Sequence, residues 1–346
     1  MSAKIDLFIV TASVFLLFLH SVFIYNPNLM LNRRFLRIKA LQEVYAYHQS
    51  ECSNLPQASR HLLEEVEDLY KLFISQLSFW VEVKQFAERR IEENRNKHFP
   101  TEEDLNPNLK FVNNRVLNVL EENKSLLKLV DKYKINYADS REDFIRSFYN
   151  RMIEYPEYQE YMNNGKNAFG DDRQFLVSVI DTYMADDSAL YDYFSDRDLS
   201  FNSDFQVAVF MLWKFISEMP ASFGIDTPMP PLYKNPDEDK EFVVKLFEKT
   251  ILHANEYREL VKANISNWDY DRLALMDKIL IFMALTEFTE FHFIPVKVTI
   301  NEYIEISKFY STPDSRRFVN GMLDKLATLL SEEGKIVKTG IGLIDK

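Results

Sequence analysis

Four basic side chains near the start of an amphipathic segment are the residues of this chain best suited to bind phosphate. They are Arg33, Arg34, Arg37 and Lys39. If residues 33–49 form a helix, these cations lie near its N-terminus, where the dipole and the free backbone N–H groups already favour anions. Such contacts give affinity and salt dependence but read no sequence. By charge alone, a solvated basic helix end explains the cluster equally well.

No catalytic or cofactor-binding pattern stands out elsewhere in the sequence. The six histidines are scattered without an H-E-x-x-H pair, and there is neither a P-loop nor a G-x-S-x-G turn. Gly340 and Gly342 follow no predicted strand, so they do not indicate a dinucleotide site. The single cysteine, Cys52, excludes an intramolecular disulfide and a cysteine-based zinc site. We therefore expect a non-catalytic protein without a cofactor or metal.

The elements that must position the basic cluster are helices, because glycine is scarce and apolar residues recur at helical spacing. The clearest pair lies in residues 295–326, PVKVTINEYIEISKFYSTPDSRRFVNGMLDKL. Thr299 and Glu302 fit a capping box, which predicts that the first helix starts near residue 300. The STPD turn then separates it from a second helix, with Asp314 or Ser315 as the expected cap.

This pair of helices closely resembles the C-terminal signature of the NusB family of bacterial transcription antitermination factors. The resemblance is most specific at Asn301-Glu302 and at Phe318-Val319-Asn320-Gly321, and it extends to residues 271–288, similar to the family's central buried helix, and to residues 33–49, similar to its arginine-rich first helix. It implies an all-α bundle. Gly321, inside the second predicted helix, further predicts that another backbone or a ligand packs closely there.

Family members bind the boxA element of ribosomal RNA transcripts with a small-subunit ribosomal protein, also called NusE, in an antitermination complex on RNA polymerase. The resemblance therefore implies a boxA-type RNA site and the same partners for this chain. Expected RNA contacts are Arg33, Arg34, Arg37, Gln42, Tyr45, Tyr310, Asp314 and Phe318, with Lys39 extending the basic end. Asp271 and Asp277 match acidic positions that face the ribosomal partner. Core packing explains Tyr45 and Phe318 equally well, and helix capping also suits Asp314.

The resemblance divides the chain into four segments. They are a hydrophobic N-terminus (1–29), the first helix of the bundle (30–50), a helical insertion (51–236) and the remainder of the bundle (237–346). The chain carries a net charge of −12, and nearly all of this acidity lies in the insertion. Screening limits the reach of charge to about 10 Å at 0.1 M salt, so the basic cluster keeps its own local potential.

The insertion is predicted to be helical throughout, although its function cannot be deduced from the sequence. A long amphipathic helix is expected over residues 59–97 and another over about 111–130, followed by helices near 141–153, 172–184 and 204–219. The proline-rich residues 227–236 are expected to form a linker. Its many aromatic residues are expected in a core rather than on a binding surface. The acidic pairs at 171–172 and 186–187 are expected to cap helices rather than hold a cation.

Residues 7–25 form an uncharged apolar run long enough to span a bilayer. One interpretation is a membrane anchor and another a signal peptide, although no small-residue cleavage site follows. We favour a third, in which translation starts at Met30, three residues before the resemblance to the family begins. The positive-inside rule places the body in the cytoplasm even if the run is an anchor.

Two rival functions stay open. The same fold occurs as the RNA-binding domain of some ribosomal RNA cytosine methyltransferases, which would make this chain an accessory of RNA modification. That activity needs a methyl-donor domain with a glycine-rich turn and a catalytic cysteine, for which seven glycines and Cys52 leave no place. A membrane-tethered helical scaffold is the other rival, and it depends on residues 7–25.

Overall fold

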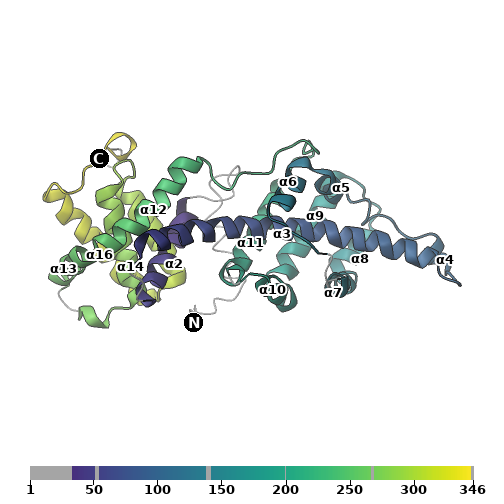
Figure 1. The fold of residues 1–346 in the computed structure, drawn as a ribbon, viewed down its shortest axis with the longest axis horizontal. Coiled ribbons are helices and arrows are strands. Elements are labelled where there is room, and N and C mark those ends of the chain that lie inside the picture. The colour runs from purple at the N-terminus through teal and green to yellow at the C-terminus, as the bar shows by residue number, and fades with distance from the viewer. Residues whose placement is uncertain (1–32, 51–53, 138–141, 199, 266–268, 344–346) are drawn as a thin grey trace. The chain divides into compact units, whose positions relative to one another are not determined.

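The computed structural model describes residues 33–50, 54–137, 142–198, 200–265 and 269–343 (Figure 1). Every regular element in these ranges is a helix, which confirms the all-α prediction. The predicted apolar run of residues 7–25 lies outside the described ranges. Among the residues that are described, no helix is both long and apolar enough to cross a membrane.

Contacts divide the chain into two compact units. Unit 1 contains the described residues up to Val66 and those from Leu232 onward, and unit 2 contains Glu67–Pro231. The helices of unit 1 are α2 (Arg33–Gln49), the first turns of α3 (Leu55–Arg95), α12 (Pro236–Leu252), α13 (Ala254–Asn264), α14 (Leu275–Glu290), α15 (Val296–Tyr310) and α16 (Pro313–Glu332), with short 3₁₀ turns η2 (Tyr270–Arg272) and η3 (Gly340–Leu343).

Helix α14 is the centre of unit 1. Its side chains are buried almost continuously from Ile279 to Phe288, and it contacts α2, α12, α13, α15 and α16. A helix that is apolar on all sides has to be surrounded by other elements, which explains this position. Helix α2 packs on α12, α14 and α15, so the two ends of the chain build one bundle.

Unit 2 is also entirely helical in its described part. After the rest of α3 come α4 (Glu102–Leu105), α5 (Arg115–Glu122), α6 (Lys124–Lys132), α7 (Glu142–Met152), α8 (Pro156–Asn163), α9 (Phe169–Val179) with the π-helix η1 (Ile180–Met184), α10 (Ser188–Ser195) and α11 (Phe201–Glu218). The predicted long helix is confirmed as α3. The helix expected over 111–130 is instead two helices, because Asn123 ends α5 and its side chain caps α6.

Aromatic residues form much of the core of unit 2, as predicted, although Tyr191 is 38% exposed. Phe79 is fully buried and its ring centroid lies 5.0 Å from that of Phe148 and 6.1 Å from that of Phe194. Trp80 packs edge-on against Phe148. Aromatic pairs in these edge-to-face arrangements contribute beyond the area they bury.

One member of each acidic pair, Asp171 and Asp187, caps a helix as predicted, whereas Asp172 is an internal hydrogen-bond acceptor. Asp187 caps α10 by accepting from the backbone of Ala189 and Leu190. Asp172 is buried and accepts from the Tyr161 hydroxyl at 2.7 Å. No metal-ligating cluster occurs among the residues that the structure describes.

Residues 227–236 lack regular structure until α12 begins at Pro236, as expected of a linker. The segment is nevertheless not a solvated tether, because Met229, Leu232 and Tyr233 are buried. The Tyr70 hydroxyl also donates to the Pro230 carbonyl at 2.8 Å.

Candidate nucleic-acid interface

Two arginines of α2, the first helix of the bundle, bind carboxylates on α14 and α15. Arg34 donates to both carboxylate oxygens of Glu302 on α15, at 2.7 and 2.6 Å. One turn later, Arg37 donates to both oxygens of Glu287 on α14, each at 2.7 Å. Paired bonds of this kind fix geometry as well as charge, so α2 has one defined register on the bundle.

Glu287 is the centre of a fully buried polar cluster. Its Oε1 also accepts from the Thr299 hydroxyl at 2.7 Å, and its Oε2 accepts from the Tyr303 hydroxyl at 3.3 Å. Burial by itself lowers the pKa of Arg37, but the charge and hydrogen bonds of Glu287 outweigh it and raise that pKa further above its ordinary value. Burial, with the nearby Glu287 charge, raises the pKa of Tyr303. The cluster therefore holds one positive and one negative charge with every Glu287 oxygen bonded.

The predicted capping box of α15 is wrong, and this cluster is the reason. Helix α15 starts at Val296, four residues earlier than expected, after Pro295 at the cap position. Thr299 turns inward to Glu287, and Glu302 turns to Arg34. Both side chains bond to other helices instead of to their own backbone.

Lys39 and Glu43, on α2, face the first turns of α3. Lys39 is buried with its Nζ 3.5 Å from Glu65, and Glu43 bonds to the ring of His61 at 2.8 Å. The ammonium group of Lys39 therefore faces Glu65 on α3.

The His61 contact predicts a pH effect. The hydrogen bond that the His61 ring donates to Glu43, with the charges of Glu43 and Glu65, raises the pKa of His61 above 6.5. The contact therefore stabilises the fold fully below pH 6.5, and this contribution is lost as pH rises through the raised pKa. An NMR titration should give His61 a pKa above 6.5 that Glu43→Gln lowers. His48 is the internal control, because burial and then Arg258 lower its pKa. A normal His61 pKa would contradict the assignment.

Arg33 is the exposed site residue of α2, and Arg34, Gln42 and Tyr45 reach the surface in part. The Arg33 side chain is 45% exposed, lies 3.7 Å from Asp239 on α12 and sits 5.2 Å above the Phe242 ring. Gln42 and Tyr45 are half-buried. The sequence did not predict that Phe242, which is itself buried, contacts Arg33.

The turn between α15 and α16 presents the second group of predicted residues. Thr312, rather than Asp314 or Ser315, caps α16 by accepting from the Ser315 backbone at 3.2 Å, so that prediction is wrong. Asp314 is consequently exposed in the first helical turn. Tyr310 and Phe318 are half-buried.

The two acidic residues expected at the partner surface lie in different environments. Asp271 is exposed in η2. Asp277 is 2% exposed in the first turn of α14 and accepts from the Ser311 hydroxyl at 2.5 Å. It therefore joins the start of α14 to the turn that leads to α16. Contact with a partner through Asp277 stays a prediction that would require this bond to open.

Gly321 does not mark a close contact within this part of the chain. It is exposed on α16, and an added Cβ would meet nothing within 4 Å among the described residues. The prediction of a closely packed backbone is therefore wrong.

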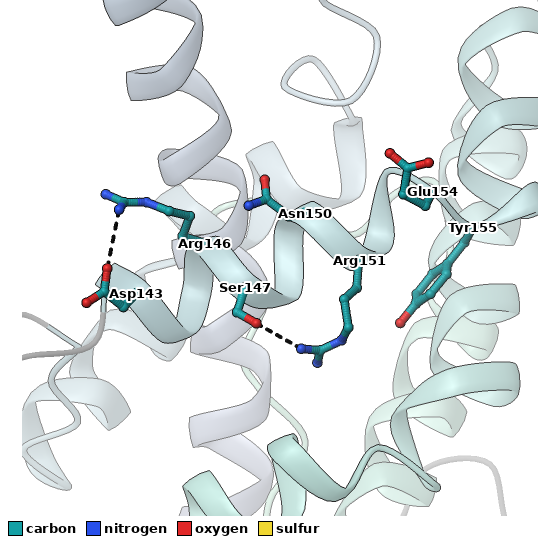
Figure 2. Close-up of a pocket in the computed structure, with 7 residues that line it drawn as sticks. All are labelled: Asp143, Arg146, Ser147, Asn150, Arg151, Glu154 and Tyr155. Atoms are coloured by element: carbon teal, nitrogen blue, oxygen red, sulfur yellow. Dashed lines mark hydrogen bonds and ion pairs between the residues drawn. The ribbon is translucent and has the colours of Figure 1, made fainter.

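A shallow groove of about 650 Å³ lies in unit 2. Figure 2 shows that α7 and the residues just after it line it, with Asp143 facing Arg146 and Ser147 facing Arg151. Arg151 is also bonded to Asp187 at 2.6 Å. These side chains pair with one another rather than converging on one point, so the groove has no arrangement typical of catalysis.

The fold and the surface of unit 1 define a helical bundle with an arginine-anchored first helix. The model of the NusB family matches residues 230–328. Three proteins named transcription antitermination protein NusB are similar to the chain: that of Salinibacter ruber at 41% identity over 111 residues, that of Chloroherpeton thalassium at 37% over 106, and that of Methylacidiphilum infernorum at 37% over 98. These matches cover 31%, 31% and 28% of this chain, and 69%, 50% and 66% of the respective relatives.

This chain belongs to the NusB family. The family match begins close to α12 and omits α2, which the structure packs onto the matched helices. No solved protein structure matches the chain.

Proposed function

We propose that this protein is a non-catalytic transcription antitermination factor that binds boxA-type RNA together with a small-subunit ribosomal protein. Membership of the NusB family, whose matched members carry that functional name, supports antitermination. The site residues on α2 and around the start of α16 supply the RNA surface in this proposal. Its place of action is the antitermination complex on RNA polymerase in the cytoplasm.

The observation that carries the RNA assignment is that the three arginines at the start of α2 are bonded differently. Arg34 and Arg37 form short paired bonds with carboxylates, which hold the helix. The Arg33 side chain is 45% exposed, and its contacts with Glu238 and Asp239 are longer, at 3.9 and 3.7 Å. A surface arginine at a helix N-terminus is suited to phosphate. Tyr45 and Phe318 offer aromatic faces on which unpaired bases can stack.

The structure also shapes the partner assignment. Asp271 remains the better candidate for contact with a basic ribosomal protein, because its carboxylate is exposed. We assign Asp277 instead to the internal bond with Ser311, which fixes the turn before Asp314.

Binding of the full chain to a boxA-type RNA oligonucleotide, across a salt series and with or without the ribosomal protein, tests the proposal. We expect tighter binding than to a scrambled RNA and a further gain when the partner is added. Equal affinity for both RNAs with no effect of the partner would overturn it.

Arg33→Gln should weaken RNA binding and reduce the slope of log affinity against log salt by about 0.7, the value for one phosphate contact on a single strand. Arg95→Gln is the matched control, since Arg95 is an exposed, acid-paired arginine on unit 2. An unchanged slope in Arg33→Gln, or equal loss in the control, would show that Arg33 does not touch phosphate.

A further inference from the structure

The C-terminal segment of unit 1 builds an exposed apolar surface together with the loop after α14. We name it the C-terminal apolar patch, and its members are Phe293, Val337, Ile341 and Leu343, which are 72%, 53%, 68% and 56% exposed. Large apolar side chains scattered singly need no explanation, but a contiguous exposed group indicates an interaction surface.

Contacts bring the members of the patch together. After α16 the chain returns to the end of α14 (yellow in Figure 1), where the Thr339 backbone donates to the His292 carbonyl at 3.0 Å and the His292 ring bonds to the Val337 carbonyl at 2.6 Å. Gly340 has a positive φ of 57° and lies against the Phe293 ring, 3.8 Å from an added Cβ. The segment is thus held in place while its apolar side chains face solvent.

Lysines accompany the patch although the protein as a whole is acidic. The two segments that form it, residues 291–298 and 335–343, contain Lys297, Lys335 and Lys338 and no acidic residue. Lys338 donates to the backbone carbonyls of Glu287 and Phe291, and so caps the C-terminal end of α14. Lys335 is 55% exposed and pairs with Glu333, and Lys297 is exposed. Val298, also exposed, adjoins Lys297.

We propose that the C-terminal apolar patch docks on the surface of a lipid bilayer that contains anionic lipids. Apolar side chains enter the headgroup region, and lysines beside them contact the lipid phosphates. A second copy of the same patch is disfavoured, because two lysine-bearing surfaces would face each other. This role goes beyond antitermination and requires no change in it.

A fluorescent reporter on the full chain tests the proposal. In a Cys52→Ser background, Ile341→Cys is labelled with an environment-sensitive dye and mixed with vesicles of phosphatidylcholine with or without phosphatidylglycerol. We expect a blue shift and protection from an aqueous quencher with the anionic vesicles. Leu252→Cys is the matched control, because Leu252 is a 63% exposed leucine of the same unit outside the patch.

Each outcome supports or contradicts docking of the patch on the membrane. In the Ile341→Cys chain, Phe293→Ser should reduce the shift, and Lys297→Gln with Lys335→Gln should weaken vesicle binding on the order of fivefold per lysine. A label at position 341 that stays in water, or that responds no more than the label at 252, overturns the proposal. A shift that appears with rising protein concentration and no vesicles would assign the patch to self-association instead.

Discussion

Replacing Arg37 by alanine should lower the free energy of unfolding of unit 1 by about 3–5 kcal/mol, because removal of one partner leaves a buried charge without compensation. Glu287 is fully buried and would keep only the Thr299 and Tyr303 hydroxyls. Urea unfolding, followed by hydrogen exchange in peptides of α14, measures the loss. Arg33→Ala on the same helix should cost less than about 1 kcal/mol, since the Arg33 side chain is 45% exposed and its ion pairs are long, at 3.9 and 3.7 Å.

A double variant distinguishes the contribution of the ion pair to stability from that of side-chain packing in this cluster. Arg37→Met with Glu287→Gln removes both charges and keeps an acceptor for Thr299, so we expect it to recover much of the stability lost in Arg37→Ala. Equal destabilisation in the single and double variants would mean that packing of the arginine stem matters more than the ion pair. An Arg37→Ala protein as stable as wild type would refute the structural role of the pair.

Phe79→Ala should destabilise unit 2 by about 3–5 kcal/mol, because it opens a cavity where the phenyl ring is fully buried among other rings. The urea midpoint from tryptophan fluorescence should fall accordingly, since Trp80 packs against Phe148 next to this ring. Phe99→Ala removes the same side chain from a position that is 92% exposed. It should stay within about 0.5 kcal/mol of wild type. Similar losses in both variants would contradict the assignment of the core.

The sequence predicted the helices of this protein better than it predicted their ends. Apolar periodicity located α3, α7, α9 and α11, because the spacing of buried residues is a property of one helix. Helices α8 and α10 were missed, since each is only eight residues long and offers about two turns of pattern. The start of α15 was misplaced because Thr299 and Glu302 fit a local capping motif and yet bond to distant residues.

The sequence by itself determined the all-α class, the family resemblance of both chain ends and the basic character of the first helix. Only the tertiary structure decided which of those basic residues face solvent. Arg37 and Glu287 are 250 positions apart and Arg34 and Glu302 are 268 apart, and no local rule links residues at such separations. Folding buries Arg37 and partly buries Arg34 to anchor α2, and it brings Lys39 against Glu65 on α3, while Arg33 stays at the surface. Burial of a charge is tolerated only where a partner is already positioned.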